Sequence, residues 1–162
     1  MTVKPLWHGG PQEKGIRPGT ENLPGIVGLG EAIKITTRNK AHERARLTRL
    51  KSWFINELKN TIPDVIINGA QNSSPHILSV SFPDAVAEMM LVRLNREGIA
   101  VSLGSACNSK NIAPSHVLLA MGIPFTQIEG TIRISLGSRT NRERLSIVLS
   151  LLPEIWRKSR IK

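Results

Sequence analysis

Two segments of the chain alternate between apolar and polar residues, which is typical of strands that bury one face. They are residues 76–82 and 131–136. Their apolar positions share one face: Leu78, Val80, Phe82, Ile132, Ile134 and Leu136. The opposite face carries mostly polar residues: Ile77, Ser79, Ser81, Thr131, Arg133 and Ser135. Because successive side chains of a strand point to opposite faces, both segments are predicted to be strands with one face in the core.

Apolar residues three and four positions apart predict one long helix. It begins near Pro24 and ends before Pro63, and a break near residues 36–39 stays open. Residues 1–22 before it are rich in glycine and proline and are predicted to be loop.

Three shorter helices are predicted further along the chain. The first follows Asp84, which is expected to cap it, and ends at Gly98. The second covers residues 115–121. The third begins near Asn141, and Pro153 is expected to kink or shorten it.

The order of these elements indicates the fold class. A strand, a helix and a second short strand follow one another over residues 76–103. Strands and helices are mixed along the chain, so we expect an α/β (α+β) small domain with one small sheet covered by helices.

Composition narrows the class of protein. The chain has 162 residues, of which 40% are hydrophobic, which suits one packed domain or one domain with part of another. No apolar run approaches the roughly 20 residues that span a bilayer, and residues 1–10 lack the apolar segment of a signal peptide. We therefore expect a cytoplasmic location and no membrane partner.

The formal net charge of +10 favours acidic partners. Basic residues gather in residues 38–51 and 157–162, where a solvated surface is the simpler interpretation. The chain has no tyrosine and few other aromatic residues, so it lacks a stacking platform and nucleic-acid binding is not expected. The four histidines are scattered without metal-ligand spacing, so no metal site is predicted.

Three features carry candidate chemistry, and each has a simpler interpretation. Cys107, the only cysteine, lies among small residues in a loop, where it is either a reactive thiol or an incidental surface residue. Arg133 lies on the outer strand face, where it can bind a carboxylate at two points or simply face solvent. Residues 9–22 combine glycines, cations and a hydroxyl before a helix, which suits a phosphate or a plain linker.

Four strings in this order resemble those of the NifS-like cysteine desulfurases of the class-V aminotransferase type. They are residues 9–22 (GGPQEKGIRPGTEN), 76–82 (HILSVSF), 101–109 (VSLGSACNS) and 130–137 (GTIRISLG). The chain departs from the family pattern at Pro11, Leu103, Asn108, Lys110 and residues 138–139, without losing a catalytic group. The resemblance extends over most of this chain but only over the C-terminal part of the family's chain.

The resemblance implies a reaction and the residues that perform it. With pyridoxal 5'-phosphate as cofactor, Cys107 takes the sulfur of L-cysteine as a persulfide, alanine is released, and the sulfur passes to an acceptor or scaffold protein for iron–sulfur clusters or tRNA thiolation. Arg133 matches the arginine that holds the substrate carboxylate. Thr20 matches a threonine that reaches the cofactor phosphate of the neighbouring subunit, so the resemblance implies a homodimer.

The resemblance also implies a division of the chain within a fold-type-I enzyme. Residues 1–35 would be the edge of a missing large cofactor-binding domain and the start of a linking helix, and residues 36–162 the C-terminal small domain. The Schiff-base lysine belongs to the missing domain, so we expect the chain to be inactive alone.

Several alternatives remain open. A selenocysteine lyase or another class-V enzyme would share the fold, and a non-enzymatic basic binding protein could reuse it. The sequence does not decide whether the chain is a fragment, half of a split enzyme or a decayed gene product.

Overall fold

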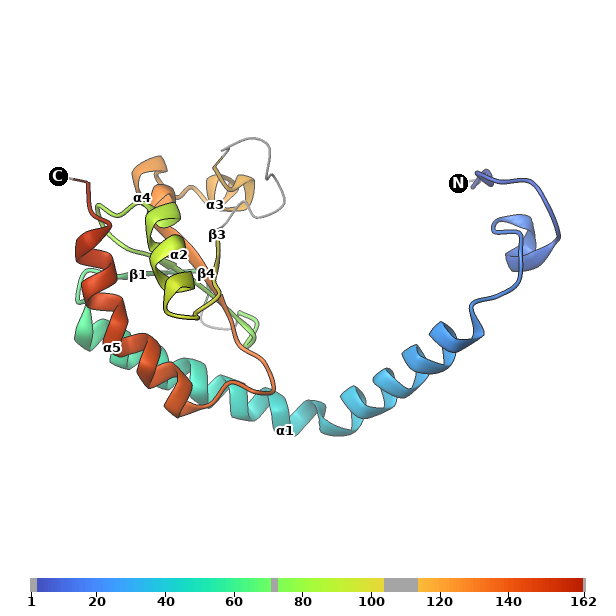
Figure 1. Ribbon diagram of the computed structural model, residues 1–162, viewed down its shortest axis with the longest axis horizontal. Coiled ribbons are helices and arrows are strands. Elements are labelled where there is room, and N and C mark those ends of the chain that lie inside the picture. The colour runs from blue at the N-terminus through green and yellow to red at the C-terminus, as the bar shows by residue number, and fades with distance from the viewer. Residues whose placement is uncertain (1–2, 71–72, 104–113, 162) are drawn as a thin grey trace. The chain divides into compact units, whose positions relative to one another are not determined.

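The chain forms two compact units, residues 1–41 and 42–162. The computed structural model describes residues 3–70, 73–103 and 114–161 (Figure 1). None of the helices in these ranges is both long and apolar enough to cross a membrane. The unit boundary falls near the predicted division at residue 35, but the assignment of residues 1–35 to the edge of a missing domain stays a prediction.

Helices and strands are mixed along the chain, as the fold class predicted. The first elements are a 3-10 turn η1 (Gln12–Gly15), α1 (Leu23–Thr61), β1 (Ile66–Asn68), β2 (Ile77–Ser81) and α2 (Ala87–Arg96). They are followed by β3 (Ser102–Leu103), α3 (His116–Ala120), α4 (Phe125–Glu129), β4 (Thr131–Ser135) and α5 (Arg142–Lys158). The strands form one antiparallel sheet in the order β1-β2-β4-β3. The predicted class, a small sheet covered by helices, is therefore confirmed.

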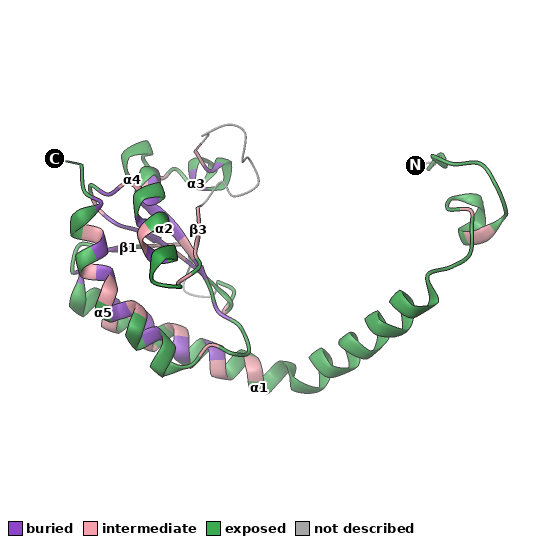
Figure 2. Cartoon of the chain, viewed as in Figure 1, coloured by how far each residue is buried: buried purple, intermediate pink, exposed green. Residues whose placement is uncertain are grey.

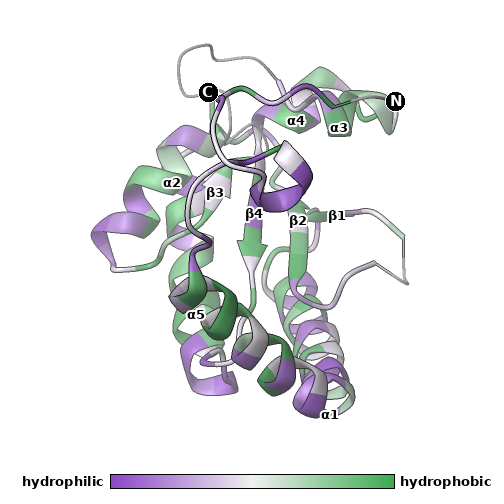
Figure 3. Cartoon of the chain, turned by 90° about the vertical axis from the view of Figure 1, so that its right-hand side faces the viewer, coloured by the Kyte–Doolittle hydropathy of each residue, from purple (hydrophilic) through white to green (hydrophobic). Residues whose placement is uncertain are grey.

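The hydrophobic core lies against one face of this sheet. The central strands contribute Leu78, Val80, Ile132 and Ile134, all of them buried. The residues that cover them come from the second half of α1, from α2 and from α5, and include Leu47, Phe54, Leu58, Met90, Leu94, Leu145 and Leu152. Figure 2 shows these buried positions, and Figure 3 shows hydrophobic and hydrophilic bands along α2. Burial of each such side chain stabilises the fold by roughly 1.5–3 kcal/mol.

The long helix is continuous, so the break left open near residues 36–39 is absent from α1. Its second half packs in the core, whereas its first half, within residues 1–41, is exposed. Apolar residues of that first half are 53–65% exposed: Leu23, Ile26, Val27, Leu29 and Ile33. The contact role expected of residues 1–35 stays a prediction.

Some local predictions are confirmed by the helix ends. Ser115 Oγ accepts a hydrogen bond from the Leu118 N–H and so caps α3. Asn141 caps α5 through the Arg144 N–H at 3.0 Å. Gly98 follows α2 with φ +73, the left-handed conformation expected of a glycine after a helix.

Other local predictions were wrong. Asp84 does not cap α2, which begins after Val86 without a side-chain cap. The Asp84 carboxylate instead accepts a hydrogen bond from Arg160 at 2.8 Å. Pro153 does not shorten α5, which continues to Lys158, and the other expected effect, a kink at Pro153, stays a prediction. The predicted strand at 99–103 is reduced to the two residues of β3.

Arg46 connects α1 to the loop between β4 and α5 through hydrogen bonds. Its guanidinium donates to both carboxylate oxygens of Glu43, each at 2.7 Å. It also donates to the backbone oxygens of Thr140 at 2.7 Å and Gly137 at 3.0 Å. The pKa of Glu43 is lowered from its ordinary value, chiefly by the hydrogen bond from Arg46. Arg46, oriented by Glu43, therefore joins segments that lie far apart in the sequence.

The Glu43–Arg46 pair predicts a defined pH dependence of stability. Because the carboxyl pKa is lower in the folded state, its stabilising effect is complete above the unfolded pKa, about 4.3, and is lost as pH falls through the folded value. Glu43→Gln is expected to lower the free energy of unfolding at pH 7 and to have a much smaller effect at pH 3. Urea unfolding at both pH values tests this, and an equal difference at the two would contradict it.

The backbone packs so closely around Gly130 that no side chain fits at this position. Its carbonyl accepts a hydrogen bond from the Phe82 N–H at 3.0 Å, and an added Cβ would clash with the Phe82 backbone oxygen. Gly130→Ala is therefore expected to lower the free energy of unfolding by about 1–3 kcal/mol. Gly137→Ala is the matched control, because a Cβ there meets no atom within 4 Å. Urea unfolding curves that coincide for the two variants would refute the close approach.

Candidate functional site

The polar face of the sheet gathers side chains from β1, β2 and β4. Strand register places Ser81 opposite Thr131, and Ser79 opposite Arg133. Because the residues between them, Val80 and Ile132, point into the core, these four must point to the other face. The predicted strand alternation is thus confirmed, and it places Arg133 where the sequence analysis expected it.

A hydrogen-bonded network fixes this polar face. The hydroxyl oxygens of Ser81 and Thr131 lie 2.6 Å apart, and Thr131 donates to the Gln127 backbone oxygen at 2.8 Å. Asn68 Nδ2 donates to Ser81 Oγ at 2.7 Å, and Gln127 Nε2 donates to Asn68 Oδ1 at 3.1 Å. Ser81 and Thr131 are almost fully buried, so these bonds remove the cost of burying their hydroxyls.

Sequence reasoning missed two members of this network. Asn68 lies in β1 and Gln127 in α4, and neither element was predicted. The only signal for the network in the sequence was the alternation of β2 and β4, which placed Ser81 and Thr131 on one face and left Asn68 and Gln127 unassigned.

Arg133 occupies the middle of the sheet, opposite Ser79 of β2 and Ser102 of β3. The residue is partly buried. Its Nε is buried and has no hydrogen-bond partner in the part of the chain that the structure describes. A buried N–H without a partner is costly. The guanidinium therefore keeps donor capacity for an oxyanion, which it binds best at two points.

Cys107 belongs to residues 104–113, outside the described residues, so its predicted place cannot be compared with the structure. The elements on either side of that segment are described. Before it, β3 pairs with β4, with Leu103 opposite Ile132 and Ser102 opposite Arg133. After it, Ser115 caps α3. The segment with the only cysteine thus follows directly from the strand beside Arg133.

Thr20 lies in the other unit, in the predicted phosphate-binding segment 9–22. Arg17 donates to the backbone oxygens of Gly19 at 3.1 Å and Thr20 at 2.8 Å. The Gly19 N–H donates to Gln12 Oε1 at 3.2 Å. These bonds order the segment, but they occupy a cation and an N–H that a phosphate would use. The Thr20 residue is exposed.

The described residues show no clustering of metal ligands: no three of their histidine and carboxylate side chains gather as a metal ion would require. A hollow of about 330 Å³ lies between α1 and the segment joining β1 to β2, and neither Arg133 nor Thr20 is among the residues given for its lining.

Comparison with known proteins finds one family model and relatives that are named cysteine desulfurases. Residues 7–148 match the family model described as Aminotransferase class-V. A cysteine desulfurase IscS of Dictyoglomus turgidum is 42% identical over 98% of this chain and 40% of its own length. The cysteine desulfurase IscS of Methanosarcina thermophila is 42% identical over 99% of this chain and 40% of its own length.

Solved structures agree with these relatives. A NifS-like protein superposes with a TM-score of 0.82 at 33% identity, over 98% of this chain and 40% of that chain. A NifS-like protein from Rickettsia africae gives 0.80 at 28% identity, over 97% and 41%. The chain spans about two fifths of the length of the relatives it matches. The predicted resemblance is confirmed, and the chain belongs to the class-V aminotransferase family, with the NifS-like cysteine desulfurases among its relatives.

Proposed function

We propose that this chain is the substrate- and sulfur-binding C-terminal part of a cysteine desulfurase. The observation that carries the proposal is Arg133: its Nε is buried and unpartnered within the described ranges, and its strand neighbours the one that leads to Cys107. The four family-like strings, in the family's order, support the C-terminal assignment.

In this proposal Arg133 binds the substrate carboxylate. A guanidinium presents parallel N–H groups that match the two oxygens of a carboxylate, so it fixes orientation as well as position. The paired strands on both sides of β4 hold the Arg133 backbone in place. The network of Ser81 and Thr131 lies on the same face, two residues along each strand, and supports the β2–β4 register there.

Cys107 is the proposed sulfur acceptor. In the overall exchange, the C–S bond of L-cysteine breaks, an S–S bond forms to Cys107 Sγ, and the former Cβ takes a proton to give alanine. Electrons and atoms balance, because the thiol becomes a persulfide as the cysteine carbon is reduced. The only cysteine of the chain, among small residues, offers a thiol for this exchange.

Pyridoxal phosphate is the cofactor that the family implies, and the described residues do not by themselves make a site for it. Thr20 offers one exposed hydroxyl, while the neighbouring Gly19 N–H and Arg17 are bonded within their own segment. A phosphate site needs several convergent N–H groups or cations. We therefore propose that Thr20 adds one contact to a phosphate site completed by another part of the protein or by a second subunit of a homodimer.

A cytoplasmic location and delivery of sulfur to a protein acceptor complete the proposal. They follow from the family resemblance, and the absence of a spanning helix in the described residues is compatible with the location.

A chimera tests the proposed function directly. The matching two fifths of the Dictyoglomus turgidum relative would be replaced by this chain, which is 42% identical to it. The chimera is expected to release alanine from L-cysteine and to form a persulfide, whereas the 162-residue chain alone releases none. Cys107→Ala in the chimera should abolish persulfide while leaving cofactor absorbance intact. A chimera that binds the cofactor but releases no alanine, or a Cys107→Ala variant with undiminished release, would refute the proposal.

The role of Arg133 has its own test in the same chimera. Loss of a two-point carboxylate contact is expected to raise the KM for L-cysteine by about 10- to 100-fold in Arg133→Gln, with a smaller effect on kcat. Arg133→Lys should recover only part of this, because an ammonium lacks the planar fork. Arg139→Gln is the control, since it makes the same charge change at an exposed position. Equal KM values for the two glutamine variants would contradict the assignment.

A further inference from the structure

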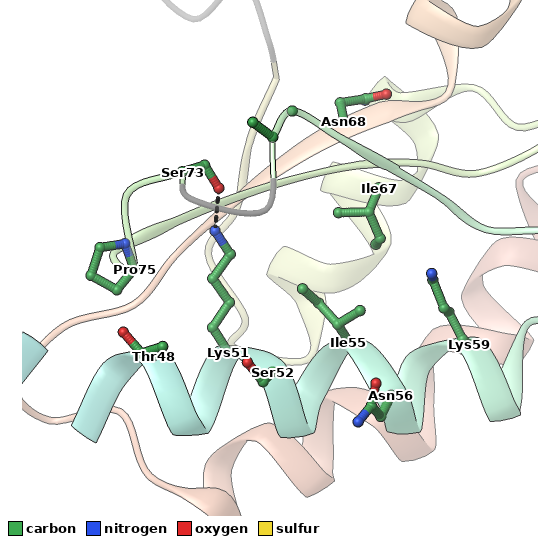
Figure 4. Close-up of a pocket in the computed structure, with 12 residues that line it drawn as sticks. Thr48, Lys51, Ser52, Ile55, Asn56, Lys59, Ile67, Asn68, Ser73 and Pro75 are labelled. Atoms are coloured by element: carbon green, nitrogen blue, oxygen red, sulfur yellow. Dashed lines mark hydrogen bonds between the residues drawn. The ribbon is translucent and has the colours of Figure 1, made fainter. Parts of the chain in front are cut away.

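The hollow of the second unit lies between α1 and the segment that joins β1 to β2 (Figure 4). Its volume is about 330 Å³, at the small end of the range for ligand pockets. The described residues that line it are Thr48, Lys51, Ser52, Ile55, Asn56, Lys59, Ile67, Asn68, Gly69, Ala70, Ser73 and Pro75. None of these described lining residues is acidic.

The helix wall of this hollow has a regular pattern. Lys51, Ile55 and Lys59 are four residues apart, so they lie on one face of α1 in the order cation, apolar, cation. The helical rise of about 1.5 Å per residue separates the backbones of the two lysines by about 12 Å. Ile67 of β1 adds a second apolar wall. Figure 4 shows the side chains of both lysines projecting from α1 towards β1 and the residues that follow it.

Lys51 is held in the hollow by neutral groups. Its Nζ donates to Ser73 Oγ at 2.8 Å and to the Ser74 backbone oxygen at 2.9 Å. An ammonium has three N–H groups, so one remains for a ligand, and the Ser73 hydroxyl can donate its own proton to the same ligand. Burial lowers the pKa of Lys51, the expected effect where a cation has been partly desolvated without a negative partner.

We propose that this hollow binds an elongated organic dianion, with one anionic group at Lys51 and Ser73, the other at Lys59, and an apolar middle against Ile55 and Ile67. An apolar residue lies between two cations about two helical turns apart on α1, so a dicarboxylate with a hydrocarbon centre meets the cation–apolar–cation order. Arg133 is not among the described residues that line the hollow, and the proposal does not depend on the desulfurase function.

Octanedioate and octanoate test this proposal on the 162-residue chain at constant ionic strength. They share the hydrocarbon length, but octanoate lacks the second carboxylate. Octanedioate is expected to bind saturably with a dissociation constant of about a millimolar, and about tenfold more tightly than octanoate. Amide shifts followed by NMR should move at residues lining the hollow, including Gly69, Ala70 and Ser73.

Two matched variants decide whether the second carboxylate meets Lys59. Lys59→Gln removes an exposed pocket cation and is expected to abolish the advantage of octanedioate over octanoate. Lys40→Gln makes the same charge change on α1 away from the hollow and should keep that advantage. Equal affinities of the two acids for the unsubstituted chain, shifts centred elsewhere, or an equal loss in both variants would overturn the proposal.

Discussion

Burial of one face of β2 and β4 is the constraint on which the rest of the structure depends. Leu78, Val80, Ile132 and Ile134 are held against α1, α2 and α5, and strand geometry then sends every intervening residue to the opposite face. A slip of one residue in the pairing would exchange the two faces completely. The position of Arg133 is therefore set by the packing of its apolar neighbours.

The opposite face stays polar because its hydroxyls have partners. Ser81 and Thr131 are as buried as core residues, yet each is bonded within a network that reaches Asn68 and Gln127. A network of this kind resists rearrangement because breaking one bond leaves a buried polar group unsatisfied. The same sheet thus combines an apolar layer that stabilises the fold with a polar layer that presents an arginine.

The sequence predicted the central strands, the long helix and the position of Arg133, because each follows from a periodic pattern. It missed β1 and α4, which have three and five residues, too few for a period to be visible. The role of Arg46 was also beyond sequence reasoning, since its backbone partners lie more than 90 residues away. Cys107 and Thr20 were assigned by resemblance alone, and their roles rest on the family strings.

The strand order β1-β2-β4-β3 leaves the two shortest strands at the edges of the sheet. β1 has three residues, and β3 has two within the part of the chain that the structure describes. An edge strand is a template on which the backbone of another chain can add, and a long, flat edge is a starting point for ordered aggregation. The β1 edge, with its three residues, presents very little continuous unpaired backbone. The sheet is therefore protected against edge-to-edge assembly at this edge, even though the first half of α1 exposes a run of apolar side chains.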